Sequence, residues 1–177
     1  MRLGCVVWLT GLPGSGKTTI ARLVEGHIRK LGLPVEVLDG DEVRKSLSPE
    51  LGFSKQDREA HARRVVYISN LLCRNGVVTI VALISPYREF RQYARETIGR
   101  NFVEVYVKAS EELCRKRDPK GLYKKAQEGK MTNLTGPQDP YEPPPNPELV
   151  IDTENESAEV CAGRVLEQLK TRGYVAK

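Results

Sequence analysis

The chain has 177 residues, of which 40% are hydrophobic, enough for one well-buried core and short for two, so we expect a single domain over residues 1–177. No apolar run is long enough to span a bilayer and no charged-then-apolar leader opens the chain, which predicts a cytoplasmic protein without a membrane partner. The net charge is +5, but basic residues are interspersed with acidic ones, which favours small anionic substrates and argues against nucleic acid.

The first expected element is a buried strand at 4–9, and a glycine-rich loop follows it. This loop, Gly11-Leu12-Pro13-Gly14-Ser15-Gly16-Lys17-Thr18, fits the pattern G-x-x-x-x-G-K-[ST] in full. A helix-compatible segment runs from Thr19 to Leu31. Glycines let the backbone curl around a polyphosphate, with its N–H groups pointing inward at the helix N-terminus. The sequence therefore predicts a nucleotide-binding P-loop rather than an ordinary glycine-rich turn.

Two side chains of the loop have expected roles in phosphoryl transfer. Lys17 would reach the β- and γ-phosphates of ATP, and the Thr18 hydroxyl would bind Mg²⁺, an ion that prefers hard oxygen ligands. The candidate ATP-binding residues of this region are Gly11, Leu12, Pro13, Gly14, Ser15, Gly16, Lys17, Thr18 and Thr19.

A second strand is expected at 35–38, and Asp39-Gly40-Asp41 follows it directly. Such a tripeptide is often only a turn. Beside a P-loop, however, the two carboxylates would lie at the carboxyl edge of the sheet, where open α/β sheets bind ligands. One would orient Mg²⁺ or its waters and the other would accept a proton from the acceptor hydroxyl. The pattern leaves open which does which; our candidate metal ligands are Thr18 and Asp39, and both aspartates are candidate catalytic residues.

A long helix is expected over residues 55–74, because a capping-box-like Ser54-x-x-Asp57 precedes it and a glycine follows it. Its apolar face contains Val65, Ile68, Ser69 and Leu72. Arg58 and His61 continue this face toward the N-terminus. They either turn to solvent at the helix start or belong to a ligand site.

Further apolar runs at 77–82, 102–107 and 149–151 alternate with amphipathic segments. This pattern predicts an α/β fold of three layers, in which helices flank a five-stranded, mainly parallel sheet. The four cysteines are scattered without a C-x-x-C pair, so we expect buried, reduced thiols and no metal cluster.

The segment at about 118–136 is polar and rich in lysine, and we interpret it as a basic lid that closes over phosphates. A solvated helix without such a role is the alternative. Six of the eleven prolines follow within 137–147, which predicts an extended connector between elements.

Several motifs together resemble one family. The stretches that carry the resemblance are Gly4-Cys5-Val6-Val7-Trp8-Leu9-Thr10-Gly11, Leu38-Asp39-Gly40-Asp41-x-Val43-Arg44, Leu51-Gly52-Phe53-Ser54, Asp57-Arg58, Arg63-Arg64, Ile84-Ser85-Pro86-Tyr87-Arg88, Arg117-Asp118-Pro119-Lys120-Gly121-Leu122-Tyr123-Lys124-Lys125 and Leu134-Thr135-Gly136. Over nearly the whole chain the sequence is similar to the adenylyl-sulfate kinases, which are P-loop kinases. The resemblance implies that ATP and Mg²⁺ are used to phosphorylate the 3′-hydroxyl of adenylyl sulfate, giving 3′-phosphoadenylyl sulfate.

The same resemblance implies a set of substrate-binding residues: Asp41, Arg44, Phe53, Arg58, His61, Ile84, Ser85, Lys120, Asn133 and Leu134. Within it, arginines would hold the phosphosulfate and ribose, and Phe53 would lie against the adenine. Arg117 matches a position near the purine of ATP. Ser85 matches a serine proposed as a phosphoserine intermediate in the family, but direct in-line transfer needs no such step, so we expect a binding role for Ser85.

Three departures from the family pattern affect these expectations. His61 stands where asparagine is usual, which suggests an acceptor affinity sensitive to pH near about 6.5. Leu134 stands where an aromatic is common, so Phe53 would carry more of the stacking on adenine. The chain also begins almost at the first strand. Dimers are usual in the family, and this departure leaves a homodimer only as a possible state of this chain.

Two other functions share some of these features. A nucleoside monophosphate or sugar kinase would have the same loop and sheet, but Asp39-Gly40-Asp41 and Ile84-Ser85-Pro86 argue against it. A GTPase-like switch would explain Asp118-x-x-Gly121, but the sequence contains no Asn-Lys-x-Asp guanine reader.

Overall fold

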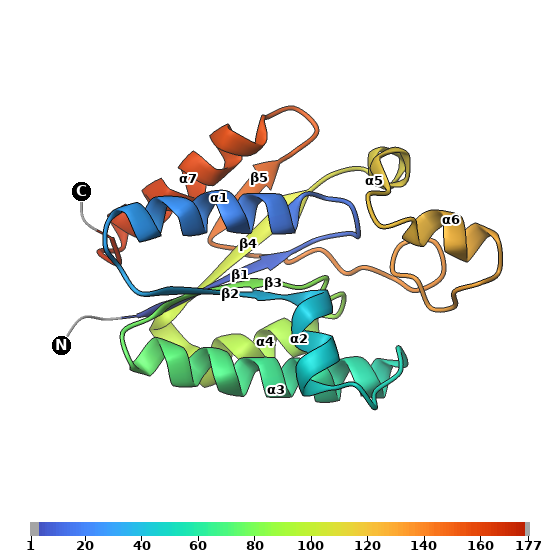
Figure 1. Ribbon diagram of the computed structural model, residues 1–177, viewed down its shortest axis with the longest axis horizontal. Coiled ribbons are helices and arrows are strands. Elements are labelled where there is room, and N and C mark those ends of the chain that lie inside the picture. The colour runs from blue at the N-terminus through green and yellow to red at the C-terminus, as the bar shows by residue number, and fades with distance from the viewer. Residues whose placement is uncertain (1–3, 176–177) are drawn as a thin grey trace.

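The computed structural model describes residues 4–175, in which a sheet lies between two layers of helices (Figure 1). The strands are β1 (Cys5–Thr10), β2 (Val35–Asp39), β3 (Val78–Ala82), β4 (Phe102–Lys108) and β5 (Leu149–Asp152). The helices are α1 (Lys17–Lys30), α2 (Gly40–Leu47), α3 (Lys55–Arg74), α4 (Arg88–Ile98), α5 (Glu111–Arg117), α6 (Leu122–Gln127) and α7 (Ala158–Thr171), with a short 3-10 turn η1 (Gly99–Asn101). The ends of the expected domain, residues 1–3 and 176–177, lie outside the described residues.

The strand order is β2-β3-β1-β4-β5, and every pair is parallel. The predicted fold class, an α/β fold around a five-stranded sheet, is confirmed. β1 occupies the centre and is buried along its whole length, which explains why its sequence is continuously apolar. Its Val7 pairs with Ile80 of β3 on one side and with Val103 of β4 on the other.

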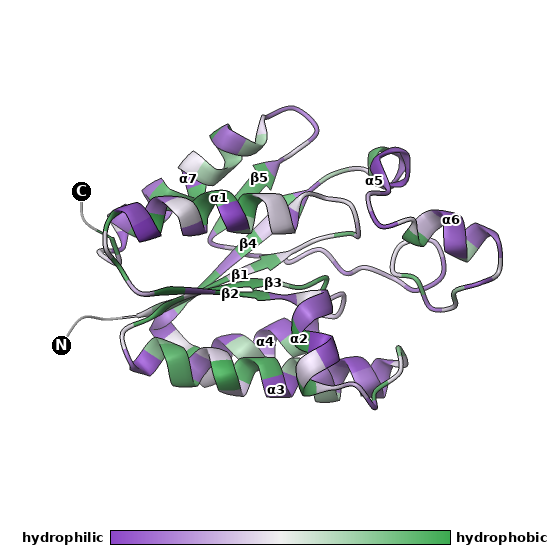
Figure 2. Ribbon diagram, viewed as in Figure 1, coloured by the Kyte–Doolittle hydropathy of each residue, from purple (hydrophilic) through white to green (hydrophobic). Residues whose placement is uncertain are grey.

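Each face of the sheet has its own apolar core, because successive side chains of a strand point to opposite faces. Val7 and Leu9 pack on the face that α1 and α7 cover, while Val6 and Trp8 pack on the face toward α3 and α4. Figure 2 shows the strands as largely hydrophobic, between helices that mix hydrophobic and hydrophilic residues. The carboxyl ends of the strands are thereby fixed from both sides.

α3 has the predicted limits, and its capping box is confirmed. The Ser54 hydroxyl accepts a hydrogen bond from the Asp57 N–H at 3.1 Å, and the Asp57 carboxylate accepts one from the Ser54 N–H at 3.2 Å. α1 instead begins two residues earlier than expected, at Lys17, because Gly16 with φ of 101° serves as its N-cap. Lys17 and Thr18 therefore lie in the first turn of the helix that follows the loop.

The polar segment at 118–136 is packed more firmly than its composition predicts. α6 lies in it, beyond the end of the sheet beside α5 (Figure 1). Tyr123 and Leu134, 5% and 4% exposed, form an apolar cluster with Ala109 and Cys114, and we call this group the lid cluster. A few apolar residues spaced along this polar stretch thus meet in space.

The proline-rich connector is extended, as predicted, and it packs against the end of the sheet. The Tyr141 and Thr10 hydroxyls are 2.9 Å apart, and the Tyr141 ring stacks on that of Tyr106. The Glu142 N–H donates to the Pro86 carbonyl at 2.8 Å, and the Glu142 carboxylate accepts from the Arg88 N–H at 2.7 Å. The connector thus joins β1, the loop after β3 and α4.

Two expectations from composition can also be compared with the fold. The side chains of Cys5, Cys73, Cys114 and Cys161 are all buried, and no disulfide joins any of them within residues 4–175. Over the same residues, no helix has the length and apolar character that crossing a membrane requires.

Candidate active site

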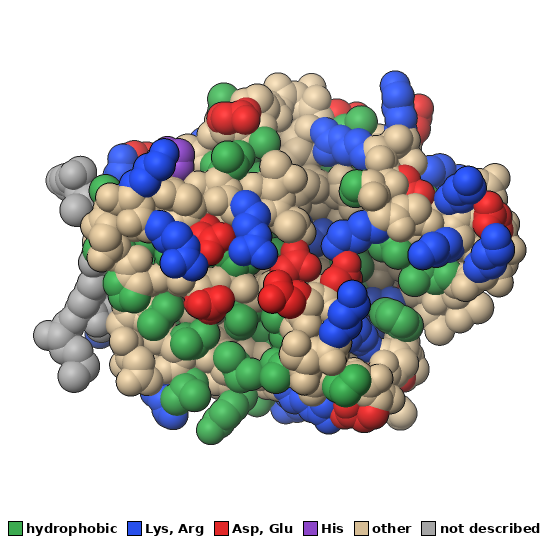
Figure 3. Space-filling view, in the orientation of Figure 1, with side chains coloured by type: hydrophobic (Ala, Val, Ile, Leu, Met, Phe, Trp, Pro, Cys, Tyr) green, Lys and Arg blue, Asp and Glu red, His purple; other side chains and the backbone are tan. Residues whose placement is uncertain are grey.

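A cleft of about 720 Å³ lies at the carboxyl ends of the strands, where open parallel sheets bind ligands. The P-loop and the start of α1 form one end, α2 and α3 form the other, and residues 117–120 close one side. Figure 3 shows acidic and basic side chains gathered over this part of the molecule, beside α5 and α6. Its volume lies within the usual range of small-molecule binding sites.

The P-loop backbone passes so close to its neighbours that side chains would not fit. A Cβ on Gly11 would lie 2.4 Å from the Val107 carbonyl oxygen, and one on Gly14 would lie 2.9 Å from that of Cys114. Gly14 also has φ of 80°, in the left-handed region. The glycines of the motif therefore allow the loop to curl beneath the cleft.

Lys17 is buried within its own loop. Its ammonium group donates to the carbonyls of Gly11 and Leu12 at 2.8 and 2.7 Å and to the Ser15 hydroxyl at 3.3 Å. Burial is the main reason that the pKa of Lys17 falls to about 7. Lys17 lines the cleft, and an anion bound there would favour the charged form of its ammonium group.

Gly11, Leu12 and Ser15 themselves do not line the cleft, although the sequence predicted them as ATP-binding residues. Their oxygens hold Lys17 instead. Pro13, Gly14, Gly16, Thr18 and Thr19 do line the cleft.

Thr18 and Asp39 meet at the base of the cleft, as expected for candidate metal ligands. The Thr18 hydroxyl donates to Asp39 Oδ2 at 2.6 Å, while Asp39 Oδ1 accepts from the Asp41 N–H at 3.2 Å and so caps α2. Both groups offer hard oxygens, which fits Mg²⁺. The residues described include no cluster of three or more His, Cys, Asp or Glu, so phosphates and water would complete such a site.

Asp41 differs from Asp39 in its surroundings. Asp39 is 7% exposed and fixed by two hydrogen bonds, whereas the side chain of Asp41 is 63% exposed and forms an ion pair with Lys120 of the lid segment. The two aspartates predicted as a pair thus occupy different electrostatic environments.

Arg44 and Arg58 form a basic wall opposite the P-loop. The guanidinium carbon of Arg44 lies 4.6 Å from the centre of the Phe53 ring, and that of Arg58 lies 5.8 Å from it. Burial lowers the pKa of both guanidinium groups, and each remains a cation. Phe53 is 45% exposed at the cleft, so a base could stack only where Arg44 leaves the ring open.

His61 lies behind this wall and is 4% exposed, so it does not turn to solvent. Its Nδ1 is 2.9 Å from the Ser48 hydroxyl oxygen. Burial, with smaller contributions from Arg44 and Arg64, lowers its pKa to about 4. This lowered pKa argues against the expected sensitivity of acceptor affinity to pH near 6.5, and the local sequence pattern gave no sign of these neighbours.

Ile84 and Ser85 line the cleft at the end of β3. Ser85 has φ of 46°, in the left-handed region that residues other than glycine rarely adopt. Its hydroxyl accepts from the Trp8 indole N–H at 3.1 Å, its carbonyl accepts from Arg91, and the Ile84 carbonyl accepts from Thr10 at 2.7 Å. These contacts hold the serine in its strained conformation.

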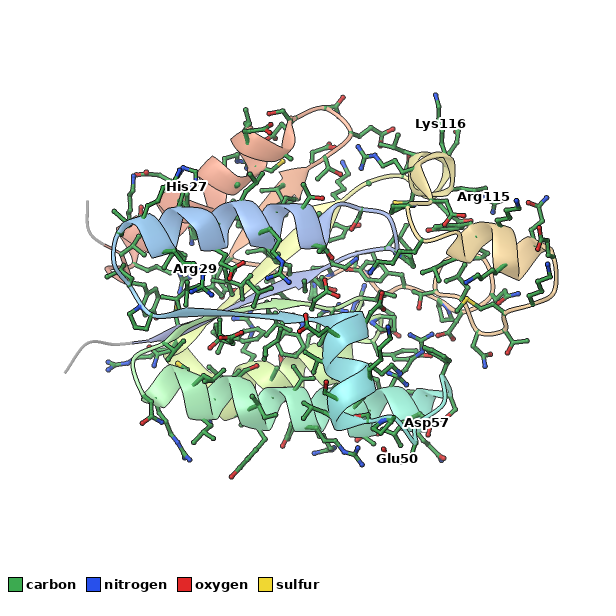
Figure 4. All side chains as sticks on the ribbon, in the orientation of Figure 1. His27, Arg29, Glu50, Asp57, Arg115 and Lys116 are labelled. Atoms are coloured by element: carbon green, nitrogen blue, oxygen red, sulfur yellow. The ribbon has the colours of Figure 1, made fainter. Side chains whose placement is uncertain are left out.

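The predicted lid residues Lys120, Asn133 and Leu134 lie in different surroundings. Lys120 lines the cleft, as does Arg117 just before the lid, whereas Lys116, on the same helix as Arg117, points away from the protein body (Figure 4). Asn133 reaches the wall only through its backbone carbonyl, which accepts from Arg58 at 2.6 Å. Leu134 lies in the lid cluster and does not line the cleft, so its contact with substrate stays a prediction.

Thr153 is a site residue that the sequence analysis missed. Its hydroxyl donates to the Ser15 carbonyl at 2.9 Å and accepts from Arg117 at 3.1 Å, which ties the P-loop to the purine side of the cleft. Thr153 directly follows β5, so the rule that ligands bind at strand ends could have found it. Trp8 and Arg91 gave no such signal, since both are buried and act through Ser85.

This combination of a P-loop after the central strand, a hydroxyl and carboxylate beside it and a basic wall opposite defines a P-loop kinase. A family model described as adenylylsulphate kinase matches residues 3–152. The chain is 51% identical over 174 residues to the adenylyl-sulfate kinase of Rippkaea orientalis, covering 98% of this chain and 96% of that protein. It is 50% identical over 172 residues to the enzyme of Halothermothrix orenii, covering 97% and 92%. The chain therefore belongs to the adenylyl-sulfate kinase family.

Solved structures agree with this assignment. The Mycobacterium tuberculosis APS kinase in complex with AMPPNP and APS has a TM-score of 0.92 and 40% identity, covering 96% of this chain and 99% of that one. A gluconokinase from Sinorhizobium meliloti has a TM-score of 0.60 and 16% identity, covering 97% of this chain and 99% of that one. At such low identity the second likeness concerns the fold alone.

Proposed function

We propose that the chain transfers the γ-phosphoryl group of ATP to the 3′-hydroxyl of adenylyl sulfate, giving 3′-phosphoadenylyl sulfate and ADP. The observation that carries this proposal is the single cleft that joins a P-loop to the basic wall of Arg44 and Arg58. Phosphoryl transfer needs two anionic partners held in line and their charge neutralised, and the two ends of the cleft suit that task.

At the donor end, the P-loop N–H groups and Lys17 hold the phosphates of ATP. Arg117 donates to the Thr153 hydroxyl, and this bond places its guanidinium at the nucleotide side of the cleft. Thr18 and Asp39 hold Mg²⁺, which neutralises charge on the phosphates when bound. Asp39 suits this role better than Asp41, since its carboxylate already contacts Thr18 at 2.6 Å.

At the acceptor end, Arg44 and Arg58 pair with the phosphosulfate, and Phe53, Ile84 and Ser85 line the adjoining pocket. Asp41 is the better candidate to accept the proton of the 3′-hydroxyl, because its carboxylate is exposed to the cleft. The Ser85 hydroxyl already accepts a hydrogen bond from Trp8, which supports a binding role and direct transfer without a phosphoserine.

Residues 118–136 act as the lid in this proposal. Lys120 contacts Asp41, and the Asn133 carbonyl contacts Arg58, so the segment touches the acceptor end at two points. Binding of adenylyl sulfate would exchange these internal contacts for contacts with the substrate. A homodimer, expected from the family resemblance, stays a prediction for this chain.

The direct test offers adenylyl sulfate, AMP and gluconate in parallel with ATP and Mg²⁺ and measures ADP release. Adenylyl sulfate should give by far the highest kcat/KM. Faster turnover of AMP or gluconate would assign the cleft to another small-molecule kinase, and a preference for GTP over ATP would favour a GTPase-like switch.

Arg58→Ala tests the acceptor wall. We expect the KM for adenylyl sulfate to rise roughly tenfold or more while the KM for ATP changes less than about twofold, because a charged pair is lost at one end only. Arg63→Ala is the matched control, since Arg63 lies on the same helix but its guanidinium pairs with Glu59 at the surface. Equal effects of Arg58→Ala on both substrates would remove Arg58 from the acceptor site.

A further inference from the structure

His61 lines the cleft with one ring nitrogen unaccounted for. Its Nε2 is one of five buried side-chain polar atoms that have no hydrogen-bond partner within residues 4–175, and Arg44 Nε is another. Both residues line the acceptor end of the cleft. A buried polar atom without a partner costs free energy, so two such atoms at one end of a cleft indicate a ligand that hydrogen-bonds there.

The neighbours of His61 favour one placement of its proton. Arg64 donates to the Leu47 carbonyl at 2.6 Å and to the Ser48 hydroxyl oxygen at 3.3 Å, and a guanidinium can only donate. The Ser48 hydroxyl oxygen lies 2.9 Å from His61 Nδ1, and while it accepts from Arg64 its own proton is available for donation to that nitrogen. A neutral imidazole that accepts at Nδ1 carries its proton at Nε2.

His61 is neutral in these surroundings. Its ring is buried, Arg44 and Arg64 are nearby cations, and together these lower its pKa to about 4. A protonated ring would add a third positive charge beside two that are already close. On this neutral ring, an Nε2–H would be an uncharged donor at neutral pH.

We propose that Ser48, itself held by Arg64, positions His61 as a neutral hydrogen-bond donor that gives its Nε2–H to an oxygen of the acceptor substrate. Ser48 is 1% exposed and touches no cleft surface, so it is a positioning residue that acts through the imidazole. The identity of the acceptor, adenylyl sulfate, rests on the proposed function. The arrangement of the three side chains does not.

The first test compares two buried serines. Ser48→Ala should raise the KM for adenylyl sulfate roughly three- to tenfold, because the imidazole loses the bond that fixes its donor, while the KM for ATP stays within about twofold. Ser69→Ala is the control, since Ser69 on α3 is also fully buried and its hydroxyl has no partner within residues 4–175. An unchanged acceptor KM in Ser48→Ala would overturn the proposal.

A double-mutant comparison separates positioning from a general structural effect. His61→Gln places an amide N–H near the position of Nε2, and an amide donates without help from Ser48. Adding Ser48→Ala to His61→Gln should therefore change the acceptor KM less than about twofold. If Ser48→Ala raised the acceptor KM as much in His61→Gln as it does in the wild type, Ser48 would support the fold and not the tautomer.

Nitrogen NMR on histidine-labelled protein reads the tautomer directly and needs no substrate. The chain has only two histidines, so the signal lost in His61→Gln identifies His61. We expect a protonated Nε2 and a bare Nδ1 at pH 7, and a mixture of tautomers in Ser48→Ala. A protonated Nδ1 in the wild type would overturn the proposal.

Arg64→Met provides a second variant if Ser48→Ala fails to fold. Arg64 has a side chain 42% exposed, and its loss frees the Ser48 hydroxyl to accept from the ring, so the NMR signal should again show mixed tautomers. Arg63→Met should not change it. If wild-type protein failed to phosphorylate adenylyl sulfate, the proposed function would fall while this spectrum still tested the placement of the proton.

Discussion

The ammonium group of Lys17 lies among oxygens of its own loop, and its pKa is lowered to about 7 by burial. Phosphates in the cleft would supply the negative charge that favours its protonated form. We expect Lys17→Ala to reduce kcat at least about 100-fold, because the transferring phosphoryl group loses a main source of charge stabilisation. Steady-state ADP release measures this. Turnover near that of the wild type, with an unchanged circular dichroism spectrum, would contradict the role of the loop.

The lowered pKa of His61 predicts how the stability of the protein depends on pH. Its folded-state pKa of about 4 lies below the unfolded value of about 6.5, so the unfolded chain binds more protons between these values. The contribution of His61 to stability is therefore complete above about pH 6.5 and is lost as pH falls toward 4. We expect the free energy of unfolding to fall less steeply over this range in His61→Gln, measured by urea denaturation.

The same pKa predicts that the KM for adenylyl sulfate does not change through titration of His61 between about pH 6 and 8. A step in this KM near pH 6.5 that disappears in His61→Gln would contradict the neutral ring.

At the scale of residues, the sequence predicted best where a motif imposes backbone geometry. The P-loop and the Asp39 position were found because glycine spacing and strand ends are local features. The burial of Leu134 and the lowered pKa of His61 were not foreseen, since both depend on residues distant in the chain. Ser85 was identified only through family resemblance, and nothing in its neighbours predicted the left-handed conformation that Trp8 and Arg91 maintain.

At the scale of elements, strongly patterned segments were predicted closely. α3 has the expected ends because its capping box, Ser54-x-x-Asp57, lies within four consecutive residues. α2 was not anticipated as a helix, since the eight residues from Gly40 are few and begin with a glycine that usually signals a turn. Its N-cap, Asp39, is the same residue that contacts Thr18.

The lid cluster offers a prediction at this scale. Leu134→Ala removes an apolar side chain that packs with Tyr123 and Cys114, and buried leucines cost about 2–5 kcal/mol when truncated. We expect faster hydrogen exchange confined to residues 109–136 and a raised KM for both substrates. Leu31→Ala, at a residue 50% exposed, should change neither. Unchanged exchange in the lid of Leu134→Ala would show that the cluster does not order this segment.

At the scale of the whole molecule, the fold class followed from alternating apolar strands and amphipathic segments. The strand order did not, because the sequence does not specify on which side of β1 each later strand adds. The buried network that joins β4 to α4 was also unpredictable. In it, Glu104 pairs with Arg91 at 2.8 Å and with Arg95 at 3.1 Å. These residues are at most 13 apart in the chain, but their sequence does not distinguish them from charged residues at the surface.

Glu104→Ala should destabilise the protein by about 3–5 kcal/mol, because it leaves the Arg91 guanidinium, 2% exposed, without its carboxylate. Thermal and urea unfolding measure this. Glu59→Ala, which breaks an exposed pair with Arg63, should cost less than about 1 kcal/mol. A similar small loss in both variants would mean that the buried pair contributes little to stability.

The proline-rich connector has a consequence for how the chain tolerates alteration. Exposed segments outside helices and strands are usually where insertions are accepted and proteases cut first. Here Tyr141 contacts Thr10, Glu142 contacts Pro86 and Arg91, and Arg88 donates to the Pro143 carbonyl, so the backbone is tied at successive residues. Lengthening it by even one residue would shift these ties out of register and release the turn at Ser85. A circular permutant opened there should therefore lose the reaction, although the cut lies outside every helix and strand.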